Sequence, residues 1–337
     1  LAPTMADQST ADLEMTDIEI DDSASLLAAE KEQVTWWEWL GFGRAAAPTP
    51  KFTKIADVDY PTLTGVRDPK HKLDIYVPHQ SPENRVEGEK KPVLIHIHGG
   101  GWIRGDKGHW FYGAPATCSA FAAFNFVTCA VGYRTKVPFP GAIDDVADAI
   151  AWVHQHIGEE QYGGDVNRVF ISGHSAGGHL ASLATLDHRW LDRRNVPRDF
   201  IKGAVSISGI YNVSNPLESA LYSWGYNKMY ITPTFGTDVN FMNDHSPATH
   251  LQAVDETQPD HHVPPFLLLN AGRDFTLEKD GMAFHAIFQA KGLHSTYKTL
   301  PSESHATISR SNDTMTTVRD FLVSLLANLT TKSEAAI

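Results

Sequence analysis

The chain has 337 residues, of which 42% are hydrophobic and 20% are charged, a composition that supports a large core and excludes a disordered chain. Its 28 basic and 40 acidic residues give a net charge of −12, so no basic stripe is available for nucleic acid or for an anionic membrane surface. No stretch reaches the roughly 18 apolar residues of a membrane-spanning helix, and we expect neither nucleic acid nor a membrane as a partner.

The first 50 residues differ in composition from the rest and are predicted to form a separate N-terminal part. Residues 1–35 hold nine acidic residues and one basic residue, which is typical of a solvated arm. Residues 34–40 contain three tryptophans and predict a short amphipathic helix, which either packs on the body of the protein or caps an active-site mouth. Met5-Ala6-Asp7 looks like a natural start and no signal peptide is recognisable, so we expect a cytoplasmic location, with secretion left open.

Residues 51–337 are predicted to form one α/β domain, because strand and helix patterns alternate along them. The predicted strands are residues 51–57, 73–77, 92–98, 126–131, 169–172, 203–208, 266–270 and 295–300. The predicted helices are residues 114–124, 142–157, 176–186, 282–290 and 314–329. Such alternation predicts a mostly parallel, eight-stranded sheet with helices on both faces. Residues 209–264 interrupt it with an aromatic-rich insertion, which we expect to lie over the carboxyl edge of the sheet.

The segment Gly173-His174-Ser175-Ala176-Gly177 follows the predicted strand at 169–172 and opens a predicted helix. A serine between glycines at a strand-to-helix junction is typical of a nucleophile elbow, in which a sharp turn presents the hydroxyl above the sheet. We therefore predict that Ser175 is a catalytic nucleophile.

A serine nucleophile needs a base and an acidic residue that orients the base, and at such elbows they follow in the order serine, acid, histidine. Asp274 and His305 come just after the predicted strands at 266–270 and 295–300, so both lie at the edge of the sheet where Ser175 lies. We predict Asp274 as the acid and His305 as the base. Asp244 and Glu303 are alternative acids, although neither follows the seventh predicted strand.

The tetrahedral intermediate of acyl transfer carries a negative oxygen, which needs preorganised N–H donors. His98-Gly99-Gly100-Gly101-Trp102 follows the predicted strand at 92–98, and its glycines allow backbone N–H groups to point into the site. We predict an oxyanion hole formed by the N–H groups of Gly100, Gly101 and Ala176, with His98 in a structural role.

We expect no metal and no cofactor. His96 and His98 lie two residues apart on a predicted strand, but the histidines form no recognisable metal-binding spacing with cysteines or carboxylates. The two cysteines, Cys118 and Cys129, are too few for a disulfide framework and are predicted to be buried thiols.

Taken together, these segments resemble the serine hydrolases of the α/β-hydrolase family. The similarity is greatest to carboxylesterases of the hormone-sensitive-lipase-like and feruloyl-esterase-like branches, and extends to kynurenine formamidases. It is carried by residues 73–76, 98–102, 132–134, 162–165, 173–180, 208–209 and 305, and covers roughly residues 51–329. The resemblance implies hydrolysis of a small-molecule carboxylic ester through an acyl-enzyme, without a cofactor.

Trp102, together with Tyr211 and Trp224 of the insertion, is a candidate for lining an apolar substrate pocket, and plain packing is the alternative for these residues. An arylformamidase that cleaves N-formylkynurenine with the same catalytic residues is the alternative function. A non-catalytic ligand receptor on a hydrolase fold is a remote alternative, because His305 is retained. A homodimer through the closing helix and last strand also fits the pattern.

Overall fold

The computed structural model describes residues 51–79, 88–214, 225–255 and 262–335. The acidic arm, the Trp-rich segment at 34–40 and Trp224 lie outside these described residues, so the expectations for them stay predictions. The same holds for the boundary predicted after residue 50.

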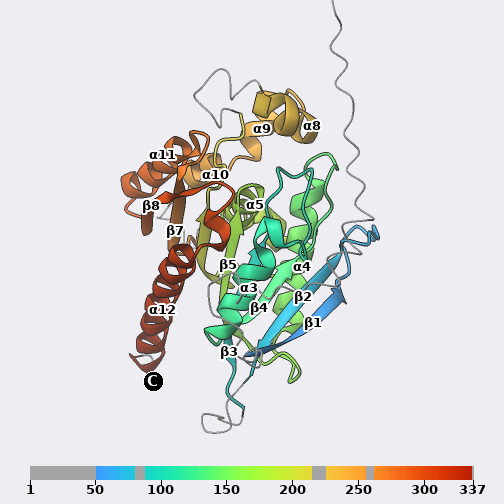
Figure 1. The fold of residues 1–337 in the computed structure, drawn as a ribbon, viewed down its shortest axis with the longest axis vertical. Coiled ribbons are helices and arrows are strands. Elements are labelled where there is room, and N and C mark those ends of the chain that lie inside the picture. Colours follow the sequence, from blue (N-terminus) through green and yellow to red (C-terminus); the bar gives the residue numbers. More distant parts are fainter. Residues whose placement is uncertain (1–50, 80–87, 215–224, 256–261, 336–337) are drawn as a thin grey trace, which may run out of the picture. The chain divides into compact units, whose positions relative to one another are not determined.

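The strands form one eight-stranded sheet in the order β1-β2-β4-β3-β5-β6-β7-β8 (Figure 1). They are β1 (Phe52–Asp59), β2 (Lys72–Pro78), β3 (Lys91–Ile97), β4 (Val127–Val131), β5 (Gly164–His174), β6 (Ile201–Ile207), β7 (Phe266–Arg273) and β8 (Ser295–Ser304). β2 pairs antiparallel with β1 and β4, and all other neighbours pair in parallel. The predicted fold class, a mostly parallel α/β sheet of the α/β-hydrolase type, is therefore confirmed.

The longer helices cover both faces of this sheet. They are α3 (Ala114–Ala123), α4 (Gly141–His156), α5 (Ala176–Leu186), α11 (Leu277–Ala290) and α12 (Asn312–Ala335). All residues of β3 are buried, as expected for a central strand with helices on either side. Ile95 of β3 packs in the same cluster as Ile143 of α4. Leu94, on the opposite face, packs with Phe121 of α3 and Leu322 of α12.

The insertion contains short helices that the sequence pattern does not predict. Those described are the π-helical turn η3 (Asn227–Ile231), α8 (Thr232–Phe235), α9 (Val239–Asp244) and α10 (Pro247–Ala253). Three more short helices lie elsewhere in the described residues: η2 (Trp110–Tyr112), α6 (Arg189–Asp192) and η4 (Ile308–Arg310). Elements of this length are too short to show a helical period. The insertion contacts α5, since His179 Nε2 donates to the carbonyl oxygen of His245 at 2.9 Å.

β7 and β8 run further than predicted, and this difference matters for the site. The predicted strands end with the apolar runs at Asn270 and Leu300, whereas the observed strands end at Arg273 and Ser304. Arg273 pairs with Ser304, and the N–H of His305 donates to the carbonyl oxygen of Arg273 at 3.0 Å. The residues that follow the two strands are therefore held side by side.

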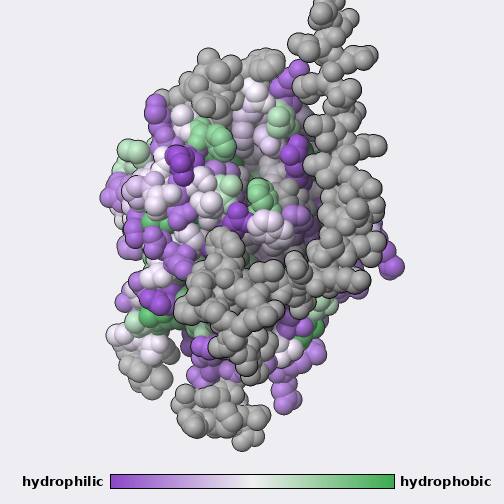
Figure 2. All heavy atoms as spheres, viewed as in Figure 1, coloured by the Kyte–Doolittle hydropathy of each residue, from purple (hydrophilic) through white to green (hydrophobic). Residues whose placement is uncertain are grey.

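The surface and the two cysteines are as the sequence predicts. On the face drawn in Figure 2, hydrophobic side chains are scattered among hydrophilic ones. Within the described residues, no helix combines the length and apolar character that crossing a bilayer requires. Cys118 in α3 and Cys129 in β4 are both free and buried, as predicted.

Candidate active site

Ser175 lies in a strained turn between β5 and α5. Its backbone has φ 54° and ψ −120°, a conformation that non-glycine residues rarely adopt. The turn also needs its glycines, because a Cβ on Gly173 would lie 2.1 Å from the carbonyl oxygen of Gly177. A Cβ on Gly177 would lie 2.2 Å from the carbonyl oxygen of Ile97. The elbow thus requires both glycines of the G-x-S-x-G pattern for steric reasons.

The structure brings the predicted nucleophile, base and acid together. The Oγ of Ser175 lies 3.0 Å from Nε2 of His305. On the other side of the imidazole ring, Nδ1 of His305 lies 2.6 Å from Oδ1 of Asp274. These distances allow proton transfer from the hydroxyl to an imidazole whose orientation is set by the carboxylate.

Asp274 is buried, and its second oxygen accepts three further hydrogen bonds. The donors to Oδ2 are Asn270 Nδ2 at 2.6 Å, Ser208 Oγ at 2.7 Å and the N–H of Ala271 at 3.0 Å. Burial alone would raise the pKa of Asp274, but the hydrogen bond and charge of His305, with the bonds from Asn270 and Ser208, outweigh it and lower the pKa. The carboxylate therefore stays ionised at neutral pH and can stabilise an imidazolium.

Neither alternative acid reaches His305. Asp244 pairs with Arg189 at 3.1 Å, and Glu303 accepts a hydrogen bond from Thr307 at 2.6 Å. Ser208 and Asn270, which hold Asp274, were not predicted as parts of the site. The signal for Asn270 is its amide at the end of a buried apolar run, since a buried polar group needs a partner.

The loop of residues 98–102, called here the oxyanion loop, lies against the elbow. A Cβ on Gly99 would be 3.3 Å from the Cβ of Ser175. Gly100 and Gly101 have φ 119° and 60°, which is accessible to glycine and strained for other residues. The N–H groups of Gly100, Gly101 and Ala176 donate to no other group in the described part of the chain. They are therefore available to an oxygen bound beside Ser175.

Tyr133, in the loop after β4, supports the oxyanion loop through two contacts with His98. Its hydroxyl donates to the carbonyl oxygen of His98 at 3.0 Å, and its ring stacks on the His98 ring with centroids 4.3 Å apart. Nδ1 of His98 donates to the carbonyl oxygen of Gly99 at 2.7 Å. Burial lowers the pKa of His98 to about 4, so this ring stays neutral. The geometry agrees with a structural role for His98.

The side chains of the two described residues predicted to line the pocket are buried. The side chain of Trp102 is buried, with its Nε1 3.3 Å from Nδ1 of His179. Tyr211 is also buried, its hydroxyl donates to Ser206 at 2.8 Å, and its ring stacks on Phe284. Both side chains pack in the core through contacts with residues far away in the sequence. A sequence pattern does not predict such contacts. The packing alternative therefore describes them, and the prediction that they line the pocket is not supported.

The remaining histidines in the described ranges do not gather into a metal site. His96 Nδ1 lies 2.8 Å from Ser172 Oγ inside the sheet, and burial lowers the pKa of His96 to about 3. Among the residues with described positions, no group of three or more His, Cys, Asp or Glu side chains could hold a metal ion.

Among protein families, BD-FAE matches residues 73–280 of this chain. This span includes Ser175 and Asp274 and ends before His305.

Two curated relatives illustrate the sequence similarity. The probable carboxylic ester hydrolase LipM of Mycobacterium tuberculosis is 30% identical over 255 residues, which cover 71% of this chain and 54% of LipM. The probable isoprenylcysteine alpha-carbonyl methylesterase ICMEL2 of Arabidopsis thaliana is 26% identical over 215 residues, which cover 62% of this chain and 48% of ICMEL2. The chain thus spans about half the length of the curated relatives that it matches.

Solved structures share the fold at lower identity. Esterase B from Lactobacillus Rhamnosis (HN001) has a TM-score of 0.69 and 22% identity, over 94% of this chain and 98% of that chain. The esterase from Pyrobaculum calidifontis has a TM-score of 0.57 and 20% identity, over 84% of this chain and 87% of that chain. At these identities the likeness extends to the fold alone.

Proposed function

The chain belongs to the BD-FAE family, and from this premise we propose that it is a serine hydrolase that cleaves carboxylic esters through an acyl-enzyme. The proposal rests mainly on the unbroken row of contacts from Ser175 through His305 to Asp274. The names of its curated relatives, which include a probable carboxylic ester hydrolase and a probable methylesterase, agree with it.

The mechanism follows from the positions of these groups. His305 takes the proton of the Ser175 hydroxyl, and the resulting oxygen nucleophile attacks the ester carbonyl carbon. The negative carbonyl oxygen accepts hydrogen bonds from the N–H groups of Gly100, Gly101 and Ala176. His305 returns its proton to the leaving alcohol, which leaves the acyl group on Ser175. Water, activated by the same imidazole, then releases the carboxylic acid and restores the hydroxyl.

Each supporting group has a definite role in these reaction steps. Asp274, ionised and fixed by Ser208 and Asn270, holds the imidazole in the tautomer that leaves Nε2 free to accept the proton. The oxyanion donors are backbone groups, two on the oxyanion loop supported by Tyr133 and one, that of Ala176, at the start of α5, so they require no reorganisation as charge develops. Loss of one such donor typically slows turnover by about 10²–10³-fold.

The test is a Ser175→Ala variant. We expect the wild-type protein to react with a fluorophosphonate probe and to hydrolyse p-nitrophenyl acetate. In Ser175→Ala the labelling should disappear and kcat should fall by about 10⁴-fold or more, because the covalent step is lost. Circular dichroism and the melting temperature control for folding, and undiminished hydrolysis by the variant would refute the mechanism. N-formylkynurenine serves as a second substrate, and a higher kcat/KM for it would favour an arylformamidase instead.

A further inference from the structure

The described part of the insertion places two tyrosines beside the oxyanion loop. Tyr226 and Tyr230 lie one turn apart at the π-helical turn η3, with ring centroids 5.1 Å apart. A Cβ on Gly101 would lie 2.2 Å from Cδ1 of Tyr230, so the Tyr230 ring packs directly on the backbone of Gly101. Unlike Trp102 and Tyr211, both tyrosines are half-buried and retain accessible surface.

The segment that carries Tyr230 is anchored in the core by the residues that follow it. Phe235 is buried, meets Trp102 edge-on at 5.0 Å and stacks on Phe139 at 4.5 Å. The N–H of Phe139 donates to the carbonyl oxygen of Thr234 at 2.8 Å. Trp102 thus acts as an anchor for the insertion, and the position of the Tyr230 ring over Gly101 is set by packed neighbours on the same short segment.

The contact with Gly101 places the Tyr230 ring beside the nucleophile. In the sheet, β3 and β5 are neighbours, so the oxyanion loop after β3 lies next to the elbow after β5. A Cβ on Gly99 would lie 3.3 Å from the Cβ of Ser175, and Gly101 lies two residues further along the same loop.

We propose, on the basis of the esterase function above, that Tyr230 determines specificity by closing the space over Gly101. An ester carbonyl bound in the oxyanion hole carries two substituents, the acyl chain and the alcohol. The one that lies on the side of Gly101 meets an anchored aromatic ring and must be short. The protein therefore acts on esters with at least one short-chain substituent, and the length limit is set by Tyr230.

The experiment compares two ester series on the full chain. One series varies the acyl chain at a constant leaving group, with p-nitrophenyl acetate, butyrate and octanoate. The other varies the alcohol at a constant acyl group, with ethyl, butyl and octyl acetate. The wild-type protein should favour the short members of at least one series. Tyr230→Ala should raise the long-to-short ratio of kcat/KM in that series by about tenfold or more, since a blocked methylene weakens kcat/KM by about 10–200-fold.

Three further variants make the test specific. Tyr230→Phe keeps the ring over Gly101 and should keep the wild-type ratio. Tyr230→Leu should shift the ratio in the same direction as alanine, and it covers the case in which alanine prevents folding. Met229→Ala is the matched control, because Met229 lies on the same turn and is 50% exposed. It should leave the ratio unchanged.

The outcomes separate the two proposals. If the wild-type protein is labelled by fluorophosphonate but Tyr230→Ala and Tyr230→Leu leave both ratios unchanged, Tyr230 does not limit the substrate and the inference fails alone. If Met229→Ala shifts the ratio as much as Tyr230→Ala, the effect comes from the segment and the inference also fails. Absence of both labelling and hydrolysis in the wild-type protein would overturn the esterase function, and this inference with it.

Discussion

His174, the residue before the proposed nucleophile, connects the elbow to His305, which follows β8. Its Nε2 donates to the carbonyl oxygen of His305 at 2.9 Å, and the two rings lie with centroids 4.9 Å apart. Burial lowers the pKa of His174 to about 3, so the ring is neutral at working pH and the proton on Nε2 remains. The contact therefore fixes the backbone of His305 relative to Ser175 without adding charge to the site.

Replacement of His174 by alanine tests this positioning role. Without this contact the imidazole of His305 is less well positioned against Ser175, and a misplacement of about 1 Å can cost about 10²-fold, so we expect kcat for p-nitrophenyl acetate to fall by about 10–100-fold. KM should change little, because the side chain of His174 is buried. His174→Gln, whose amide can donate to the same carbonyl, should recover most of kcat. Equal losses of kcat in both variants, or a change confined to KM, would argue against positioning.

Among the elements of the site, the sequence predicts the conformation of the elbow but does not predict the contact between Asp274 and His305. The elbow is largely local, because a Cβ on Gly173 would clash with Gly177 four residues further along the chain, whereas the clash at Gly177 is with Ile97 of β3. The meeting of Asp274 with His305 is not local. It depends on the last residues of β7 and β8, which pair through backbone hydrogen bonds and carry no apolar pattern. The sequence therefore predicts the edge on which these residues lie but not their contact.

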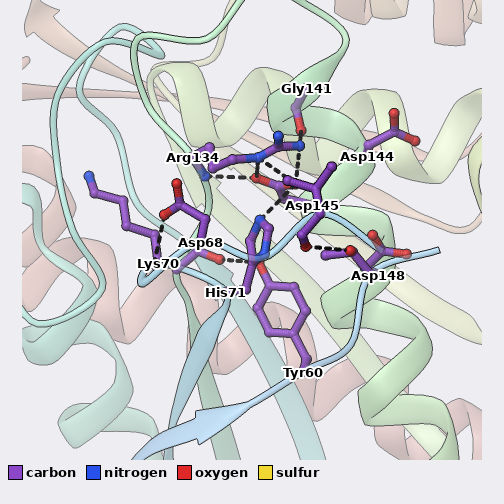
Figure 3. Close-up of polar contacts among 12 residues, drawn as sticks. Tyr60, Asp68, Lys70, His71, Arg134, Gly141, Asp144, Asp145 and Asp148 are labelled. Atoms are coloured by element: carbon purple, nitrogen blue, oxygen red, sulfur yellow. Dashed lines mark hydrogen bonds and ion pairs between the residues drawn. The ribbon is translucent and has the colours of Figure 1, made fainter. Parts of the chain in front are cut away.

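The loop after β4 depends on a buried ionic network on α4, which Figure 3 shows. Asp145 is buried and accepts from the N–H of Arg134 at 2.8 Å and from its Nη2 at 2.7 Å. Arg134 follows Tyr133, whose ring and hydroxyl support His98 in the oxyanion loop. The network thus links helix packing to the geometry of the proposed oxyanion hole.

Asp145→Ala should destabilise the fold strongly, because it leaves the Arg134 guanidinium without its carboxylate. Removal of one partner of a buried pair costs about 3–5 kcal/mol, which urea unfolding would measure. Asp199→Ala is a matched control, since Asp199 pairs with Lys202 at 3.0 Å with 63% of its side chain exposed. The control should change the free energy of unfolding by about 0.5 kcal/mol or less. A similar change in the free energy of unfolding in both variants would mean that the network contributes no more stability than an exposed ion pair.

For the whole molecule, the pattern of alternating elements predicts the sheet well and the pocket poorly. Aromatic residues of the insertion look alike in sequence, yet Tyr211 is buried while Tyr230 is half-buried against Gly101. Which of them faces the site is decided by contacts between segments more than a hundred residues apart, such as Gly101 with Tyr230. Periodicity carries no information on such contacts, so the sequence pattern alone does not predict which residues line the substrate side of the site.

Unfolding by acid is a further property of the whole molecule, because the pH dependence of the free energy of unfolding is the sum of contributions from all buried titratable groups. Burial is the main cause that lowers the pKa of His96, His174 and His179 to about 3 and that of His98 to about 4. Their ordinary pKa is 6.5, so between about pH 4 and 6.5 the unfolded chain binds protons that the folded chain does not. The free energy of unfolding must therefore fall as the pH falls through this range.

One buried acid acts in the opposite direction. Burial raises the pKa of Asp280 from 3.8 to about 7, although the N–H groups of Tyr211 and Asn212 donate to its carboxylate and lower it in part. Between about pH 4 and 7 the folded chain holds a proton that the unfolded chain has lost, so this group stabilises the fold as the pH falls. It offsets one of the four histidines above.

For these five groups the balance is a net uptake of about three protons on unfolding between pH 4.5 and 6, or up to about 4 kcal/mol per pH unit. Burial also lowers the pKa of His188, His245 and His262, which add to this uptake. Urea unfolding at several pH values measures this slope. His96→Asn, whose amide can replace the contact of Nδ1 with Ser172 at 2.8 Å, removes one titrating group from the sheet. The variant should be less stable than the wild-type protein at pH 7, yet lose about 1.4 kcal/mol less per pH unit on acidification. An identical slope in both proteins would show that His96 is not the neutral buried group that its position requires.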